Sequence, residues 1–304
     1  MAALTSRTLV SFDWAMKRLL RSPANFGVLE GFLTSLLGEA IVIDAVLESE
    51  SLQEHAQHKQ TRVDLKARDS AGRTLIIEVQ HERQDDFLSR LLFGASQALV
   101  EQLPKGVNYS EVSKIIAISL VYFPLGQGSD YGYHGRTHFV GISKPSEELQ
   151  LSSDQKQLYR HEQVYQLFPE YYILRVNEFD SVAKTSLEEW LYVLKHSEVK
   201  PEFKAPGLEE AAEKLAVMKL SDEERRAYQA FHMALRDRLS VWDSSYGSGH
   251  RKGLEKGRKE GLQKGREEGK RQANIELAHK LLAQGMPRDQ VLQLTQLHED
   301  DLSL

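Results

Sequence analysis

The chain has 304 residues, enough for one large or two modest domains, and its 41% hydrophobic and 27% charged residues fit a globular protein. It contains no cysteine, which excludes a disulfide framework, a thiolate zinc site and a cysteine nucleophile. Its formal net charge of −5 means that nucleic-acid binding has to come from local basic patches.

The first clear pattern is a helix over residues 11–20, with Ser11 as a plausible N-cap. Asp13 and Lys17 lie four residues apart on this helix. Their spacing fits an ion pair worth about 0.2–0.5 kcal/mol, and Asp13 fits equally well as an acid near a metal site. A second helix is predicted over residues 26–37 and a strand over residues 41–47.

Residues 62–80 have the pattern of a β-hairpin. Apolar and polar side chains alternate over residues 63–68, as in a half-buried strand. Residues 69–72 supply turn chemistry. The apolar run over residues 75–77 then indicates a strand that is buried on both faces.

Two acidic residues of this hairpin are expected to meet. Asp64 lies in the first strand and Glu78 ends the apolar run of the second. Gln80 shares a face with Glu78, because side chains two apart on a strand point the same way. If the strands pair, Asp64 reaches the same place. Two such carboxylates repel unless a divalent cation lies between them, and hard oxygen ligands suit Mg²⁺ or Mn²⁺.

A helix is predicted over residues 87–103, directly after the hairpin. Arg90 falls in its first turns, near the carboxyl end of the preceding strand. It could bind a phosphate through two hydrogen bonds, or it could pair with Asp86 four residues earlier. The sequence leaves both interpretations open.

Further strands are predicted over residues 112–123, 136–142 and 171–176. Alternation of helices and strands around an apolar hairpin indicates a mixed α/β sandwich. Its end is expected near residue 178. From residue 186 the pattern is helical, up to a Ser/Gly-rich stretch over residues 242–250 that is typical of a linker.

Glycine recurs every four residues beyond that stretch, at Gly253, Gly257, Gly261, Gly265 and Gly269. Residues 251–271 hold nine basic and four acidic side chains, a local charge of +5. Each glycine costs about 1 kcal/mol of helix stability against alanine, so a helix of this kind needs a compensating contact. Close approach of the same helix from a second copy is the preferred interpretation. A flexible basic linker is the alternative.

The last part of the chain has the pattern of two short helices. One is predicted over residues 274–284, with Gly285 as its stop, and one over residues 287–296. This arrangement is similar to a small helix-turn-helix.

The hairpin residues resemble the core of the PD-(D/E)XK nuclease superfamily, in which an aspartate and a turn precede (Asp/Glu)-X-Lys. Here the tripeptide is Glu78-Val79-Gln80, so glutamine replaces the lysine. The Asp-turn-Glu-X-Gln core is similar to that of the Rpn-type recombination-promoting nucleases and transposases. The flanking features agree with that family: Asp13 with Lys17, Arg90, residues 106–109 and the glycine-periodic tail.

The resemblance implies a restriction-endonuclease-like α/β fold, a mixed sheet flanked by helices and followed by a helical C-terminal region. The implied organisation is a nuclease-like core over residues 1–178, a helical extension over 179–242, a glycine-periodic charged linker or helix over 243–272, and a small helical segment over 273–304.

The implied activity is that of a metal-dependent DNA endonuclease with a role in DNA recombination. An RNA-directed or defence nuclease uses the same chemistry, and the sequence does not separate the two roles. The site residues that it implies are Asp64, Glu78 and the Val79 carbonyl as ligands of Mg²⁺ or another divalent cation, Gln80 to orient the water, Asp13 as a further acid, Arg90 on a phosphate, and Lys66 as a weaker phosphate candidate. The competing interpretation is a catalytically weak scaffold that binds DNA or protein through its helical tail. The intact acid pair is against this alternative, and Gln80 is for it.

DNA and a second copy of the chain are the expected partners. Residues 1–20 have no continuous apolar core and the apolar run over 115–123 is too short to span a bilayer. No signal peptide, membrane partner or small-molecule cofactor is therefore expected, and the location is predicted to be cytoplasmic.

Overall fold

A computed structural model describes residues 9–47, 64–103, 106 and 108–302 of the chain. The chain divides into two compact units, Met1–Asp237 and Arg238–Leu304. Across the described residues, no helix combines the length and the apolar character that crossing a membrane requires.

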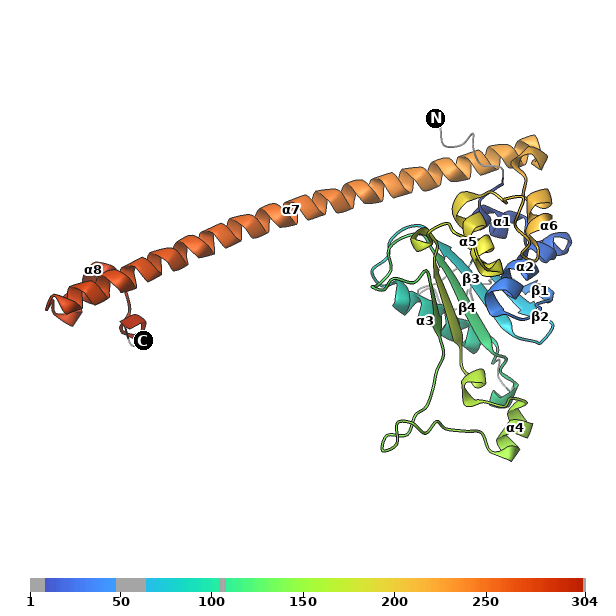
Figure 1. The fold of residues 1–304 in the computed structure, drawn as a ribbon, viewed down its shortest axis with the longest axis horizontal. Helices are drawn as coiled ribbons and strands as arrows, with labels where there is room; N and C mark the ends of the chain where they lie inside the picture. Colours follow the sequence, from blue (N-terminus) through green and yellow to red (C-terminus); the bar gives the residue numbers. More distant parts are fainter. Residues whose placement is uncertain (1–8, 48–63, 104–105, 107, 303–304) are drawn as a thin grey trace. The chain divides into compact units, whose positions relative to one another are not determined.

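The first unit is built on a mixed sheet of six strands in the order β1-β2-β3-β4-β6-β5 (Figure 1). Strands β3, β4 and β6 are parallel to one another, and the other pairs are antiparallel. The carboxyl ends of the three parallel strands therefore meet at one edge. The strands are β1 Ile43–Leu47, β2 Leu65–Asp69, β3 Thr74–Gln80, β4 Ile115–Val121, β5 Gly132–Gly135 and β6 Glu170–Arg175.

Helices cover both faces of this sheet, which confirms the expected α/β architecture. Helix α3 packs on one face against β4, and α1, α2, α5 and α6 gather on the other (Figure 1). The helices of the chain as described are α1 Phe12–Arg18, α2 Phe26–Leu37, α3 Phe87–Glu101, α4 Ser153–Tyr159, α5 Ser186–His196, α6 Leu208–Lys214, α7 Asp222–Ala283 and α8 Arg288–Thr295.

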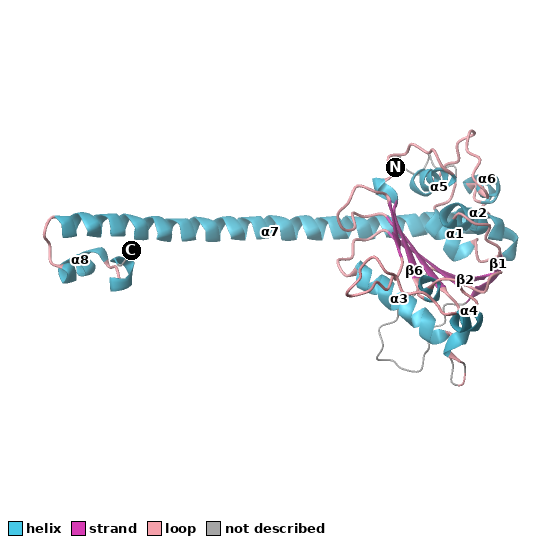
Figure 2. Ribbon diagram, turned by 60° about the horizontal axis from the view of Figure 1, so that its bottom comes forward, coloured by secondary structure: helices cyan, strands magenta, loops and turns pink. Residues whose placement is uncertain are grey.

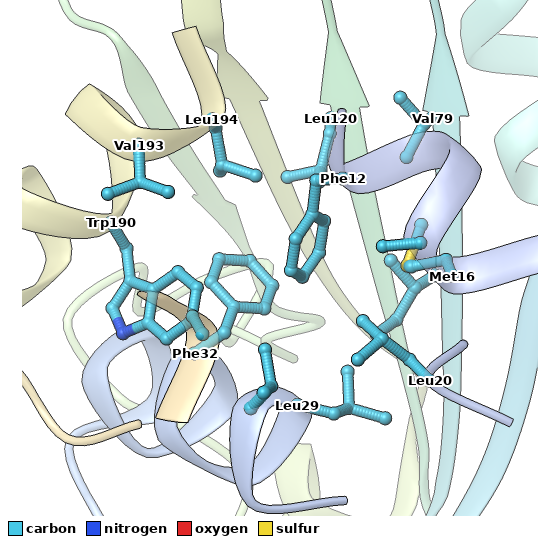
Figure 3. Close-up of a cluster of buried hydrophobic side chains, with 14 of the residues drawn as sticks. Phe12, Met16, Leu20, Leu29, Phe32, Val79, Leu120, Trp190, Val193 and Leu194 are labelled. Carbon is cyan, nitrogen blue, oxygen red and sulfur yellow. The ribbon is translucent and has the colours of Figure 1, made fainter. Parts of the chain in front are cut away.

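The larger core lies between the sheet and the four helices (Figure 3). Phe12, Phe32 and Trp190 meet edge to face, with ring centroids 5.5 to 6.0 Å apart. Each aromatic side chain buried in this way contributes about 1.5–3 kcal/mol. The same core reaches Val79 of β3 and Leu120 of β4, so it fixes α1 against the strand that carries Glu78.

Helices α2 and α6 come into very close contact at two glycines. A Cβ built on Gly31 would overlap the carbonyl oxygen of Pro206 and lie 2.5 Å from the Cα of Gly207. Gly207 itself has a φ of +78°, a conformation that side chains disfavour. Trp190 closes this contact by donating a hydrogen bond of 3.0 Å to the Pro206 carbonyl.

The predicted hairpin is confirmed. Strands β2 and β3 pair antiparallel, and Gly72 at the turn has a φ of +79°. Asp64 lies directly before β2 rather than inside it, because the strand begins at Leu65. Residue 63, which was expected in the strand, lies outside the described residues.

The strand predicted over residues 136–142 is wrong. The chain instead forms β5 before it, and within 136–142 only Val140 makes an isolated bridge, to Glu148. The alternating pattern there does not mark a buried face, since Ile142 is fully exposed and Phe139 is 41% exposed.

The linker predicted over residues 242–250 is also wrong, because helix α7 runs through this stretch and through the glycine-periodic segment. The flexible-linker interpretation of that segment is therefore not supported. The helix begins with a capping box, in which Ser221 and Glu224 exchange side-chain-to-backbone hydrogen bonds. Lysine, arginine, glutamate and leucine between the glycines are strong helix formers and offset their cost.

In the second unit, α8 packs back against the end of α7 (Figure 2). Gly285 ends the long helix with a φ of +87°. Ala278, Val291 and Thr295 are buried between the two helices. The side chain of Asn274 donates a hydrogen bond of 2.9 Å to the carbonyl of Thr295, which ties the two helices together.

Candidate functional site

The register of the hairpin places two carboxylates together at the carboxyl end of β3. Leu65 faces Ile77, so the next pair along the strands is Asp64 and Glu78. Asp64 Oδ2 accepts a hydrogen bond of 2.7 Å from the backbone N–H of Val79. The end of β2 is thereby held against the strand that carries Glu78.

The carboxylate of Glu78 is buried and incompletely satisfied. Arg90 Nη2 lies 2.5 Å from its Oε1, as an ion pair, yet no donor among the described residues is aligned with Oε1 as a hydrogen bond. Burial raises the pKa of Glu78 above its ordinary value, and the charge of Asp64 raises it further, while Arg90 and Lys17 oppose both. Arg90 and Lys17 thus offset only part of the cost of burying the ionised form, and a bound cation would offset more of it.

Two cations of the first helical region reach Asp64. Lys17 Nζ lies 3.1 Å from Asp64 Oδ1, and Arg21 donates a hydrogen bond of 2.9 Å to the Asp64 backbone carbonyl. The spacing of Asp13 and Lys17 allowed an ion pair between them, but Lys17 pairs with Asp64 instead.

Asp13 is buried and bound to a histidine. His81 Nε2 lies 3.1 Å from Asp13 Oδ2, and the His81 ring stacks on Tyr122 with centroids 4.2 Å apart. Burial alone would raise the pKa of Asp13, but hydrogen bonds from His81 and Ser11 and the charge of His81 lower it to about 2. Asp13 is thus a well-stabilised carboxylate, and its role as a further catalytic acid stays a prediction.

The other predicted residues have partners of their own. The Gln80 amide donates a hydrogen bond of 3.1 Å to the carbonyl of Glu82. Lys66 Nζ lies 2.5 Å from Glu101 at the far end of α3. Arg90 binds Gln84 Oε1 at 3.1 Å in addition to Glu78, so its charged group is directed at the acid pair and not at Asp86.

The acid pair fits a divalent cation. Mg²⁺ is commonly bound through one or two carboxylates, with water and substrate phosphate completing its ligands. Asp64 and Glu78 provide hard oxygen donors, and Glu78 Oε1 has acceptor capacity to spare. Within the described ranges no group of three or more histidine or acidic residues is arranged to hold a metal, and Asp13 as a further acid at this site stays a prediction. The Val79 carbonyl as a third ligand stays a prediction.

Sequence reasoning missed two residues at this site. His81 directly follows Gln80, so its position at the end of β3 could have been inferred from the sequence. Its contact with Asp13 could not. Lys17 was considered only as the neighbour of Asp13. Its contact with Asp64 depends on how α1 packs on the sheet, which no local pattern reveals.

The mixed sheet with helices on both faces and a carboxylate pair at a strand end defines a protein of the PD-(D/E)XK nuclease class. Residues 10–245 match the family described as "PD-(D/E)XK nuclease family transposase", and residues 271–304 match "Rpn/YhgA-like nuclease family, C-terminal HTH domain". The chain belongs to the first family, whose match spans well over half of it, and its residues 271–304 are similar to the helix-turn-helix domain of the second. The resemblance seen in the sequence is confirmed. No curated protein and no solved structure matches the chain.

Proposed function

We propose that the chain is a metal-dependent DNA endonuclease that hydrolyses phosphodiester bonds and acts in DNA recombination. The observation that supports this most directly is the pair Asp64 and Glu78, which the hairpin register brings together, with the pKa of buried Glu78 raised. Membership of a nuclease family supports it as well. A cytoplasmic location is part of the proposal and agrees with the absence of cysteine.

Asp64 and Glu78, with the Val79 carbonyl, would hold Mg²⁺ or another divalent cation. When bound, such a cation polarises a scissile phosphate and lowers the pKa of bound water. Gln80 would orient the attacking water through its amide. A neutral amide cannot stabilise the negative charge of the transition state as a lysine does. With glutamine at residue 80 and no other compensating group, hydrolysis would be slower than with lysine there.

Arg90 would bind a phosphate of the substrate. Its guanidinium lies at the acid pair, and it would exchange the ion pair with Glu78 for a phosphate when Glu78 binds the metal. Lys66 is the weaker candidate, because Glu101 holds its ammonium and only 12% of its side chain is exposed. Asp13 would act from the neighbouring helix through its ionised carboxylate.

Plasmid cleavage tests the proposed site. Supercoiled DNA is incubated with Mg²⁺, with Mn²⁺ and with EDTA, using the wild type, Asp64→Ala and the control Asp154→Ala on the exposed start of α4. We expect metal-dependent nicking that Asp64→Ala lowers by at least about 100-fold and the control leaves unchanged. Cleavage that survives in Asp64→Ala would refute the site. A wild type that cleaves with neither metal would favour the scaffold alternative, which the ion pairs on both carboxylates support.

DNA binding is proposed for the second unit, with its electrostatic part in the glycine-periodic segment. Residues 271–304 hold three basic and five acidic side chains, a net charge of −2, against +5 for residues 251–271. Phosphate contacts supply most of the salt-dependent affinity for DNA. Neutralising Arg258 and Arg266 with glutamine should therefore weaken binding to all sequences and reduce its salt dependence.

We further propose that the glycine-periodic segment associates with the same segment of a second copy. Beyond the backbone of its own helix, a Cβ on any of its five glycines would meet no atom of the described residues within 4 Å, so no packing contact described for the chain requires glycine there. Residues 253–260 and 261–268 repeat the pattern Gly-Leu-x-Lys-Gly-Arg-x-Glu, which places Leu254 and Leu262 at equivalent, exposed positions. A four-residue period drifts by about 40° per step, so a partner helix would wrap in the right-handed sense.

Replacing glycine by alanine separates this proposal from a helix that acts alone. The triple variant Gly257→Ala, Gly261→Ala and Gly265→Ala should be more helical, by about 1 kcal/mol for each substitution. If the glycines serve close approach, sedimentation should show weaker self-association than in the control Gly247→Ala, which lies in the same helix outside the repeat. Unchanged or stronger association would contradict the proposal.

A further inference from the structure

The motif position that usually carries a cation brings no charge in this chain. Gln80 occupies it, and its amide is bound to the carbonyl of Glu82. Hydrolysis of a phosphodiester nevertheless builds negative charge on the phosphate, and a preorganised cation is a strong means of stabilising that charge. Another group at the acid pair is therefore needed to supply it.

Helix α1 brings an ammonium group to the same place. Lys17 Nζ lies 3.1 Å from Asp64 Oδ1 and 5.6 Å from the centroid of the Phe231 ring. The side chain is 43% exposed, which leaves the ammonium accessible to a substrate.

Three other cations near the hairpin are less suited to this role. Arg90 already has a proposed role on a substrate phosphate, and Gln84 as well as Glu78 binds its guanidinium. Arg21 donates to the backbone of Asp64 and not to its carboxylate. Lys66 is bound to Glu101, away from the pair. Lys17 combines contact with a carboxylate oxygen and open access.

We propose that Lys17 is a catalytic residue that takes over, from helix α1, the role of the lysine that Gln80 replaces. Its ammonium contacts the scissile phosphate and stabilises the charge that develops there. In this hydrolysis a water oxygen bonds to phosphorus, the bond from phosphorus to the sugar oxygen breaks, the water loses a proton to solvent and the leaving oxygen gains one. Lys17 keeps its own proton throughout. The inference rests on the proposed nuclease function.

Relocating the charge tests the assignment. Four variants are compared with the wild type at saturating Mg²⁺ or Mn²⁺: Lys17→Met, Lys17→Arg, Gln80→Lys and the double variant Lys17→Met/Gln80→Lys. Lys156→Met is the control, because it removes an exposed lysine of helix α4 that pairs with Glu162, outside the acid pair. Thermal unfolding shows whether each variant is folded.

We expect Lys17→Met to lower the cleavage rate at saturating DNA by about 100-fold or more, with little change in DNA affinity. Lys17→Arg should keep part of the rate, and the double variant should regain at least about tenfold over Lys17→Met, because its charge returns to the site from the strand. A lysine that only neutralised Asp64 would not produce this rescue.

Two outcomes would overturn the proposal. A folded Lys17→Met chain that cleaves within threefold of the wild type would show that its charge is not used, as would a double variant no faster than Lys17→Met while Gln80→Lys alone is active. Both leave the nuclease function standing. A wild type that cleaves with neither metal would overturn the nuclease function and the role of Lys17 together.

Discussion

Glu78 and Glu170 lie at opposite ends of the parallel part of the sheet, and they are almost equally buried, with 7% and 6% of their side chains exposed. Glu170 begins β6 and is surrounded by donors. His134 Nε2 lies 2.5 Å from its Oε1, Arg136 Nε 2.9 Å and the Tyr172 hydroxyl 3.0 Å, and Lys114 binds the other oxygen. Glu78 has one arginine and an oxygen without an aligned donor.

The pKa values of the two glutamates move in opposite directions as a result. Burial raises the pKa of both, but hydrogen bonds from Lys114, Arg136 and His134 and the charge of Lys114 lower that of Glu170 to about 2. For Glu78 burial prevails and the pKa stays raised. Desolvation prevails at Glu78 and the donors prevail at Glu170, so one end of the sheet has a structural ion cluster and the other a carboxylate with a raised pKa. Glu78 is therefore the better candidate for a metal ligand, because fewer cationic side chains of the protein surround it.

Cleavage activity should separate the two glutamates most strongly. Glu78→Gln keeps the shape of the side chain and removes its charge, so we expect the rate of metal-dependent plasmid cleavage to fall by at least about 100-fold. Glu170→Gln should cleave within threefold of the wild type per folded molecule. Equal losses of cleavage activity in the two variants would mean that Glu78, like Glu170, has only a structural role.

Stability in urea should reverse that order. Glu170→Gln leaves Lys114 and Arg136 without their counter-charge, and we expect the free energy of unfolding at pH 7 to fall by about 2–4 kcal/mol. Glu78→Gln leaves Arg90 without its counter-charge, but Arg90 is more exposed than Lys114 and the variant also removes a charge that burial disfavours, so its loss should stay within about 1 kcal/mol. A Glu78→Gln chain that is the less stable of the two would contradict the comparison.

Metal binding should stabilise the chain through Glu78 and not through Glu170. At a metal concentration ten times Kd, binding adds about 1.4 kcal/mol to the free energy of unfolding. Thermal unfolding with Mn²⁺ and with EDTA measures this gain. It should be present in the wild type and in Glu170→Gln, and largely lost in Glu78→Gln.

The pH dependence of stability should show the smallest difference. The pKa of Glu170 falls from an ordinary 4.5 to about 2, so its contribution is complete above pH 4.5 and is lost as the pH drops toward 2. The pKa of Glu78 is raised from 4.5, so its contribution is complete below pH 4.5 and is lost as the pH rises through the folded-state value.

Urea midpoints measured from pH 2 to pH 7 test both signs. Glu170→Gln should give a shallower loss of stability in acid, although Asp13 keeps part of that loss because its pKa is also lowered, to about 2. Glu78→Gln should remove a loss on the side above pH 4.5. An unchanged acid limb in Glu170→Gln would show that its cluster is not intact in solution.

The hairpin and its acid pair were open to prediction because both follow from local pattern. Period-two alternation marks the strands, and antiparallel pairing across a short turn then sets Asp64 opposite Glu78. The helix predicted over residues 26–37 has the observed bounds, with Gly38 in the left-handed conformation as its C-cap.

The cations of the site could not be predicted in this way. Lys17 reaches Asp64 only because Phe12 and Met16 bury the opposite side of α1 in the core, so its direction is a consequence of packing (Figure 3). Arg90 was assigned two possible partners, a phosphate and Asp86, and its actual contact with Glu78 depends on how α3 crosses the sheet.

Helix α7 shows a different source of error, in which local composition predicted the wrong structure. Serine and glycine over residues 242–250 indicated a linker, yet the residues are helical. A glycine penalty of about 1 kcal/mol acts on one position, whereas a helix gains from every neighbouring turn once it has formed. Composition over a short window therefore underestimates a long cooperative helix.

The contact between Gly31 and Gly207 places a constraint on how this sequence can change over time. Neither position can accept even one methyl group while the other backbone stays where it is. A substitution at residue 31 would have to arrive together with a compensating change in the chain around residue 207, which is far away in sequence. Among related chains, these two positions are expected to vary as a pair, and their covariation would report a helix contact that supports the acid pair without touching it.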